Sequence, residues 1–478
     1  MTGWITGFLA VAAMNALLLS PDAAAAAATN KLDDDHITVA VETKLFHDDA
    51  VPSHKIDVDT RQGIVTLQGT VNNYYSKLEA ANAAESIKGV LEVVNKIQVR
   101  PLARLDSLIQ GDVVSALAVD PVTESYEIDV RVKDRVVTLA GKVDSYTEKT
   151  VAGEVAEGVQ GVVDVKNELT FDVVSDRTDA DIADDIRYRL RSDASIDAGL
   201  ITVTVNDGKV TLAGSVGSAA EKREAQYEAW IVPGVRSIAN TIHVKWWLDG
   251  GAADWTAGWT DDNAQKAVES ALARHPRVNP FNITTTVKHG VATLTGRVDN
   301  LRAKRAAEEA VRDSLGVWRV KNHVRVQPAV TRTDAQLARD IRYALRRDPH
   351  VDRFHITVNV YNGKAYLTGV VDLLFMKEQA EEATARVAGV VAIQNNLDVD
   401  CVIPAKTDRE IKDDIESQLR WSPFVDRDEV TVEVRSGVAT LRGTVEDWNE
   451  LQAAREIARE GGATSVISKL KVENGAGS

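Results

Sequence analysis

One pattern of glycines and apolar residues recurs six times along this 478-residue chain. The copy that shows the pattern most clearly has three apolar residues spaced four apart, followed by glycines 18, 6 and 20 residues further on: Ile182, Ile186, Leu190, Gly208, Gly214 and Gly234. Successive copies start 72 to 82 residues apart. Because each copy is long enough to bury a small core of its own, the repeat predicts six tandem domains and not one large core.

The other copies keep the same frame with few departures. Arg135 replaces the first glycine of the second copy, and the last copy is one residue shorter before its final glycine. We predict turn and strand-end roles for the glycines of the frame, and no phosphate-binding motif accompanies them. These glycines are Gly63, Gly69, Gly89, Gly141, Gly161, Gly208, Gly214, Gly234, Gly290, Gly296, Gly316, Gly363, Gly369, Gly389, Gly437, Gly443 and Gly462.

Each part of the frame predicts one element of secondary structure. The apolar spacing of four, preceded by capping-box pairs, indicates an amphipathic helix; the pairs are Thr178 with Asp181, Thr333 with Gln336 and Thr407 with Glu410. Two alternating runs joined by Asp-Gly or Asn-Gly predict a hairpin whose turn needs positive φ, so Arg135 predicts a different or strained turn in copy two. An alanine-rich second helix and a short strand complete the copy, and a right-handed crossover places that strand in the same sheet.

The predicted fold class is therefore α+β, a tandem array of six small two-layer αββαβ domains. Each domain has a three-stranded mixed sheet with both helices on one face, and the linkers are short enough to favour a compact or curved array. The predicted boundaries are 1–29 for a signal peptide or N-terminal anchor, 30–100, 101–173 and 174–245 for the first three domains, 246–259 for a Trp-rich linker, and 260–328, 329–402 and 403–478 for the last three.

The first 28 residues differ from the repeats. A nearly uncharged apolar run is followed by PDAAAAAATN, which offers small residues at several cleavage positions. This favours an export signal, although no Lys or Arg precedes the run, so an uncleaved anchor or a misplaced start also fits. The single cysteine, Cys401, excludes an intramolecular disulfide.

Composition and side-chain spacing argue against several function classes. A net charge of -15 makes nucleic acid a poor general partner. The closest histidine pair, His350 and His355, has no carboxylate or cysteine at metal-ligand spacing, and no Ser, His and Asp set suggests a nucleophile. We therefore expect no catalytic residues, no metal and no cofactor, and hence a protein that is not an enzyme.

A tryptophan-rich connection interrupts the regular period between copies three and four. The stretch WWLDGGAADWTAGW places four of the nine tryptophans within 14 residues: Trp246, Trp247, Trp255 and Trp259. One interpretation is a hydrophobic clasp that packs two three-domain halves together. The other is an interfacial anchor or a partner site, because indole favours membrane boundaries and protein interfaces.

Charge also varies between copies. Residues 260–327 contain 12 Lys and Arg against 7 Asp and Glu, whereas residues 104–173 contain 7 against 14. Arg302, Lys304 and Arg305 cluster at the start of the second helix of copy four. Such a run usually forms a solvated helix face, but a basic helix near tryptophans also suits peripheral binding to anionic lipid. We keep these three residues and the four tryptophans as binding candidates.

The frame resembles the BON domain, a bacterial module named for osmotically induced periplasmic and nodulation-associated proteins. The resemblance rests on G-x-V-x-L-x-G-x-V before the second helix and G-V-x-x-V-x-N after it, and it covers nearly everything beyond the export segment. The terminal asparagine is present in five copies and is Ser468 in the sixth: Asn95, Asn167, Asn240, Asn322 and Asn395. The resemblance implies an envelope or periplasmic setting, a role in osmotic or envelope stress, phospholipid binding in some members, and no catalytic residues.

Together these inferences predict a non-enzymatic, envelope-associated protein that contacts phospholipid headgroups weakly and multivalently during osmotic or envelope stress. Multiplying a weak module six times favours avidity for an extended surface. The alternative is a protein-binding scaffold or a periplasmic holdase-like stress protein with envelope proteins as partners. A cytoplasmic location follows instead if the N-terminal segment is not a signal, and the oligomeric state is not predicted.

Overall fold

A computed structural model describes residues 32–472 except 121, 124–126, 172–176, 194, 247–259, 276, 279–281, 313, 318, 329–331, 352–355, 401–405 and 446–447. The predicted signal segment, Cys401, His355, and Trp247, Trp255 and Trp259 lie outside the described residues. We number the six repeats as modules 1 to 6 in chain order.

The predicted fold class is confirmed, because every module contains a helix, two strands, a second helix and a final strand. The first helices are 14 residues long: α2 (Asp34–His47), α4 (Asp106–Val119), α6 (Asp179–Ser192), α9 (Asp261–Arg274), α11 (Asp334–Arg347) and α13 (Asp408–Trp421). The second helices are α3 (Tyr74–Glu85), α5 (Tyr146–Glu157), α7 (Ala219–Trp230), α10 (Leu301–Arg312), α12 (Leu374–Ala385) and α14 (Trp448–Glu460). The capping boxes predicted at Thr178, Thr333 and Thr407 are all formed.

The strands follow the same order in each module. The first strands are β1 (Ile56–Arg61), β4 (Ile128–Lys133), β8 (Ile201–Asn206), β11 (Ile283–Lys288), β15 (Ile356–Tyr361) and β18 (Val430–Arg435). The second strands are β2 (Ile64–Val71), β5 (Val136–Val143), β9 (Lys209–Val216), β12 (Val291–Val298), β16 (Lys364–Val371) and β19 (Val438–Val445). The last strands are β3 (Glu92–Val99), β10 (Ser237–Val244), β17 (Ala392–Val399), β20 (Ser465–Val472), and two interrupted ones, β6 (Asp164–Asn167) with β7 (Thr170–Phe171) and β13 (Arg319–Asn322) with β14 (Arg325–Val326).

The second strand is central in every sheet. It pairs antiparallel with the first strand and parallel with the last, as the register of module 3 shows through Thr204 opposite Thr211 and Thr211 opposite Ala239. Alternate residues of each strand therefore point to the helices and form one small core per module, while the other set lies on the opposite face of the sheet.

All six hairpin turns have positive φ at both central residues. In module 3 these are Asp207 at 51° and Gly208 at 70°, which is the geometry that suits a tight two-residue hairpin. Module 2 builds the same turn from Asp134 at 53° and Arg135 at 65°. Of the two outcomes predicted for this turn, the structure shows the strained one, because an arginine occupies a left-handed conformation that favours glycine.

An aspartate at the start of each first helix holds the hairpin turn of its own module. In module 3 the two carboxylate oxygens of Asp179 accept the backbone N–H groups of Asp207 and Gly208 at 2.7 and 2.9 Å. These bonds lower the pKa of Asp179 below its ordinary value. Equivalent pairs of bonds occur in the other five modules, at Asp34, Asp106, Asp261, Asp334 and Asp408.

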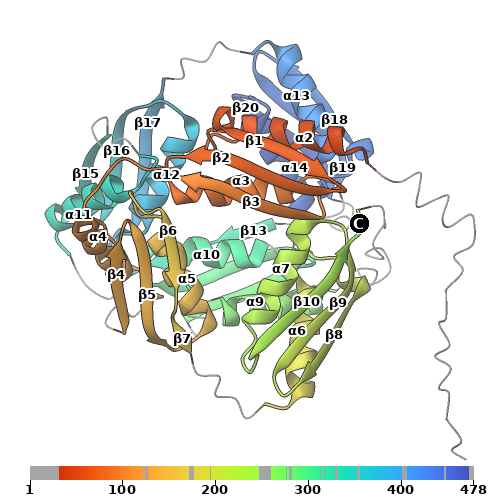
Figure 1. The fold of residues 1–478 in the computed structure, drawn as a ribbon. Coiled ribbons are helices and arrows are strands. Elements are labelled where there is room, and N and C mark those ends of the chain that lie inside the picture. The colour runs from red at the N-terminus through yellow and green to blue at the C-terminus, as the bar shows by residue number, and fades with distance from the viewer. Residues whose placement is uncertain are drawn as a thin grey trace, which may run out of the picture.

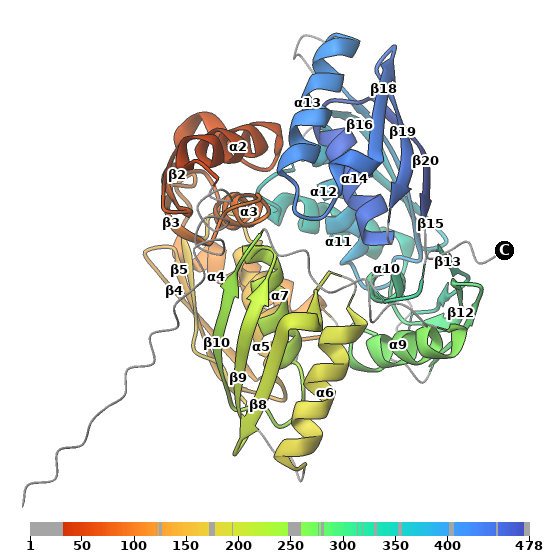
Figure 2. The ribbon, with the colours of Figure 1, turned by 90° about the vertical axis from the view of Figure 1, so that its right-hand side faces the viewer.

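The modules pack as two groups of three, with modules 1 to 3 in one group and modules 4 to 6 in the other. Figure 2 shows the first half of the chain on the left and the second half on the right, and Figure 1 shows second helices such as α3, α10 and α12 toward the middle of the particle. Contacts within the first group include stacked rings of Tyr146 and Trp230, with centroids 4.6 Å apart, and an ion pair between Arg223 and Glu85.

The two groups meet through three cross pairs built on the same contact. The residue before the third glycine of one module donates its backbone N–H to the carbonyl of the last residue of a first helix in the other group. These bonds join modules 1 and 6, 2 and 5, and 4 and 3: Lys88 to Trp421 at 2.9 Å, Gln160 to Arg347 at 2.9 Å and Leu315 to Ser192 at 3.1 Å. The expectation of a compact array agrees with these contacts.

Candidate functional site

The structure places the predicted basic cluster of α10 between modules and not on an open helix face. The Arg302 side chain is 17% exposed and its guanidinium lies 2.5 Å from the carboxylate of Asp120 in module 2. Arg305 pairs with Glu381 at 2.5 Å and with Glu382 at 3.2 Å, both in module 5. Arg302 and Arg305 therefore connect module 4 to its neighbours.

Asp120 is the centre of this inter-module ion cluster. Its side chain is 3% exposed and also receives Arg277, which is 9% exposed, at 2.9 Å. Burial and the neighbouring Arg277 lower the pKa of Arg302 to about 10, so the guanidinium stays charged at neutral pH. Burial and the same arginine lower the pKa of His275 to about 4, so this imidazole is neutral there. A buried carboxylate with two guanidinium partners is a structural device that fixes how modules 2 and 4 meet.

The other sequence candidates are less engaged. Lys304 is half-buried, and its backbone carbonyl accepts the side-chain amide of Asn322 at 3.1 Å. Trp246 is half-buried and its ring lies 5.9 Å from the ammonium of Lys88 in module 1. The structure does not bring Trp246 together with the basic cluster of α10 in any contact among the described residues.

The excess positive charge of module 4 lies instead on the outer face of its sheet. Register and burial place Lys288, Arg297, Arg319, Lys321 and Arg325 on that face, all exposed, beside the exposed His323. The remaining positions of this face are Thr284, Thr286, Val291, Thr293 and Thr295. It carries no Asp or Glu, and none of its five cationic side chains has an ion-pair partner among the described residues. We call it the basic sheet face; β12 and β13 lie at the right-hand edge of Figure 2.

The sheet faces of the other modules differ in charge. Module 6 has four cations and one acid on the corresponding face: Arg435, Arg442, Lys469 and Lys471 with Glu433. Module 3 is nearly uncharged there and is covered by small residues: Thr202, Thr204, Thr211, Ala213, Ser237, Ala239 and Thr241. Sequence reasoning missed the basic sheet face, although alternation along β12 and β13 assigns every second residue to it.

One group of three acidic side chains lies close enough to hold a metal ion: Asp193, Glu224 and Glu228, with oxygens within 4.8 Å of one another. Arg189 already lies 2.6 Å from Glu228 and supplies positive charge to the group. We assign no metal to this cluster. Within the part of the chain that the structure describes, no helix is both long enough and apolar enough to cross a membrane.

Comparison with known proteins places these observations in a family context. Six segments match the BON domain, and they are residues 33–101, 105–172, 178–245, 260–328, 333–401 and 407–474. Osmotically-inducible protein Y of Escherichia coli (strain K12) is 33% identical over 147 residues, which are 29% of this chain and 73% of that protein.

Two solved structures of CdsD, a structural protein of the type III secretion system of Chlamydia trachomatis, are also similar. They share 16% and 14% identity, each with a TM-score of 0.13, over 47% of this chain and over 94% and 99% of theirs. At that TM-score the likeness adds nothing to the assignment.

Proposed function

The chain belongs to the BON domain family, and from this premise we propose that it is a non-enzymatic, envelope-associated stress protein that binds anionic phospholipid surfaces. Its relationship to osmotically-inducible protein Y supports a role in osmotic or envelope stress. The apolar segment 1–29 supports export to the periplasm or the envelope.

The basic sheet face is the observation that carries the lipid proposal. Five exposed cations without a single acid stand on one sheet of a chain whose net charge is -15. Neighbouring strands are about 4.8 Å apart and alternate residues about 7 Å apart, so these charges cover a flat area the size of a few headgroups. Each Lys or Arg near an anionic surface contributes about 1 kcal/mol, which gives weak, salt-sensitive binding.

The closed arrangement of modules changes how multivalency would work. Sheets on different sides of the particle cannot all meet one flat membrane, so six equal contacts are not expected. Figure 2 places the sheets of modules 4 and 6 on the same side of the particle, and module 6 has the next most one-sided sheet charge. We propose that these two faces share the contact, with the tryptophans of residues 246–259 as an interfacial anchor next to module 4.

A second candidate is binding of unfolded or partner polypeptides, and exposed leucines favour it. Leu102, Leu105 and Leu108 are 82%, 69% and 55% exposed at the junction of modules 1 and 2. Side chains three residues apart at a helix start present one apolar strip, which suits a protein partner better than a headgroup layer.

Vesicle flotation separates the two candidates. Residues 30–478 are used so that the apolar run 1–28 cannot insert into lipid by itself. Vesicles of phosphatidylglycerol mixed with phosphatidylcholine should carry the protein at low salt, whereas pure phosphatidylcholine vesicles should not. The triple variant Arg297→Gln, Arg319→Gln, Lys321→Gln should bind about 100-fold more weakly, because three contributions of about 1 kcal/mol are lost.

A matched control removes the same charge elsewhere. The triple variant Arg339→Gln, Arg409→Gln, Lys412→Gln alters side chains on the first helices that are 60%, 90% and 45% exposed, and it should float like the unaltered protein. Equal loss in both triple variants would reduce the effect to net charge. Absence of flotation with anionic vesicles would overturn the lipid proposal and favour the leucine strip.

A further inference from the structure

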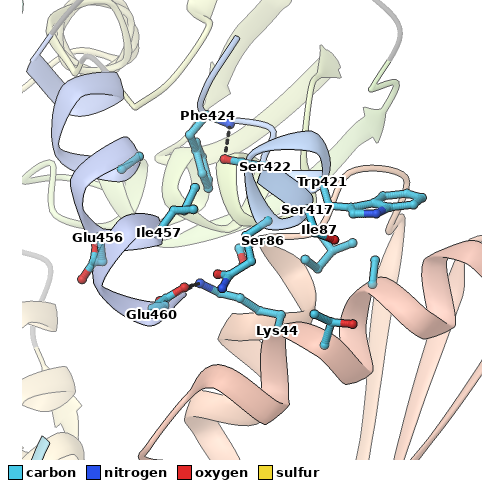
Figure 3. A pocket seen from close by; sticks show the side chains of 14 residues that line it. Lys44, Ser86, Ile87, Ser417, Trp421, Ser422, Phe424, Glu456, Ile457 and Glu460 are labelled. Atoms are coloured by element: carbon cyan, nitrogen blue, oxygen red, sulfur yellow. Dashed lines mark hydrogen bonds and ion pairs between the residues drawn. The ribbon is translucent and has the colours of Figure 1, made fainter. Parts of the chain in front are cut away.

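A cavity of about 180 Å³ lies where the first and last modules meet. Its walls come from α2 and the segment after α3 in module 1, and from α13 and α14 in module 6 (Figure 3). The cavity belongs to one of the three cross pairs, so any molecule inside it would touch both ends of the repeat array.

Most of the cavity wall is apolar. Ile87 from module 1 faces Phe424 and Ile457 from module 6, and Ala40 and Ala453 add small apolar surface. An apolar cavity of about 150 Å³ accommodates benzene, so this one has room for a single six-membered ring with a substituent. The lining thus selects for a small, partly apolar body.

Gln418 is the polar exception inside this wall. It is only 7% exposed, it lines the cavity, and neither its amide nitrogen nor its amide oxygen has a hydrogen-bond partner. Buried side-chain amides are normally paired, and each orphaned group costs about 1–3 kcal/mol. A donor and an acceptor that are both unpaired and adjacent point to a missing partner with the complementary edge.

The fold itself does not demand an amide at this position. In the shared frame Gln418 corresponds to Lys44 in module 1, and to Ala116 and Ala344 in modules 2 and 5, which form another cross pair. Lys44 reaches across to Glu460 of module 6 at 2.5 Å and closes one side of the cavity, as Figure 3 shows. The first and last modules therefore carry polar groups where the equivalent pair has alanines.

We infer that this cavity binds a small cyclic amide, that is, a lactam ring whose cis N–H and C=O lie side by side. A primary amide such as Gln418 presents an acceptor beside a donor, and a cis-amide edge pairs with it through two parallel hydrogen bonds. The ring would pack against Phe424 and Ile457 while its amide edge satisfies Gln418. Bound there, the ligand stabilises the contact between modules 1 and 6, a role that does not depend on the proposed lipid binding.

The first test uses δ-valerolactam and its N-methyl derivative as probes of the full chain. Saturation-transfer NMR and the shift in Tm should show δ-valerolactam bound with a Kd of roughly millimolar, as suits so few atoms. N-methyl-δ-valerolactam lacks the donor and should bind about tenfold more weakly or less well still. Equal binding of the two lactams, or no binding of either, would overturn the inference and leave a cavity that holds only water.

The second test changes the amide. Gln418→Leu keeps the size of the side chain, so it should raise the Tm of the ligand-free protein and abolish the preference for δ-valerolactam over its N-methyl form. Gln68→Leu replaces an exposed glutamine of β2 and should leave both properties unchanged. A preference that survives in Gln418→Leu would contradict the assigned role of Gln418, and if that variant does not fold, the comparison of the two lactams decides alone.

Discussion

At the turn of module 2, Arg135 occupies a backbone conformation that its five counterparts fill with glycine. Its φ is 65°, and its carboxylate partner Asp106 accepts the N–H groups of both turn residues at 2.9 Å. The guanidinium also donates to the carbonyl of Pro101 at 3.1 Å. A left-handed conformation costs a residue with a Cβ atom about 1–2 kcal/mol, so the surrounding contacts hold this turn in place.

Two substitutions at this position separate backbone strain from side-chain contacts. Arg135→Ala and Arg135→Gly both lose the bond to Pro101, but only glycine relieves the strain. We expect the glycine variant to be more stable than the alanine variant by about 1 kcal/mol in urea unfolding. Equal stability of the two would show that the turn of module 2 is not strained.

His350 is a buried imidazole at a contact between modules 5 and 1. Its ring packs against Phe375 with centroids 5.0 Å apart and against Tyr75 at 5.2 Å. Burial lowers its pKa from 6.5 to about 4. Because the folded pKa is below the unfolded one, the contribution to stability is complete above pH 6.5 and is lost as the pH falls toward 4.

The variant His350→Phe should remove this acid sensitivity. Relative to the variant, the unaltered protein should lose about 2 kcal/mol of stability between pH 7 and pH 5, measured by denaturant unfolding at each pH. Asp348 accepts the backbone N–H of His350, and burial raises its pKa to about 6, which has the opposite effect in both proteins. Parallel pH profiles would contradict a neutral, buried His350.

At the scale of elements, most of the fold could be predicted from the sequence. Spacing identified both helices, alternation identified the strands, and the crossover rule placed the last strand beside the second one. The aspartates at the helix starts were interpreted as caps and dipole partners, yet their main contact is the hairpin turn. The signal was available, since an aspartate precedes both turn residues by 28 and 29 positions in every copy. Only the paired geometry of helix and hairpin explains that spacing.

Removing one of these aspartates should loosen its own module. Asp334→Ala deletes the acceptor of the N–H groups of Asn362 and Gly363, both at 2.9 Å. We expect a loss of about 1 kcal/mol and faster hydrogen exchange at those two amides. Asp398→Ala, on the exposed face of β17, is the matched control and should leave both readouts unchanged. Unchanged exchange at the turn in Asp334→Ala would mean that the carboxylate does not hold it.

At the scale of the whole molecule, sequence reasoning reached the number of modules but not how they pack. Arg302 finds Asp120, which is 182 positions earlier in the chain, and no periodicity within module 4 reveals that partner. The same limit hid the role of the sheet faces, because the charge of a helix can be read locally whereas its exposure depends on neighbouring modules. The prediction that α10 presents its basic residues to solvent is therefore wrong for Arg302.

The ion cluster around Asp120 should stabilise the packing of modules 2 and 4. Asp120→Asn leaves two buried guanidinium groups without their carboxylate, and we expect a loss of about 3 kcal/mol in the free energy of unfolding. Asp129→Asn changes an exposed carboxylate on the sheet of the same module and should cost less than about 0.5 kcal/mol. Similar effects of the two changes would show that Asp120 is not an organising contact.

Small-angle X-ray scattering of residues 30–478 tests most directly whether the modules close into one particle, on which both the lipid face and the cavity depend. A closed particle of this length should have a radius of gyration of about 22 Å. Six modules strung out in line should instead exceed roughly 40 Å. A value near the first, unchanged between low and high salt, is the result expected here, and a value near the second would contradict the account.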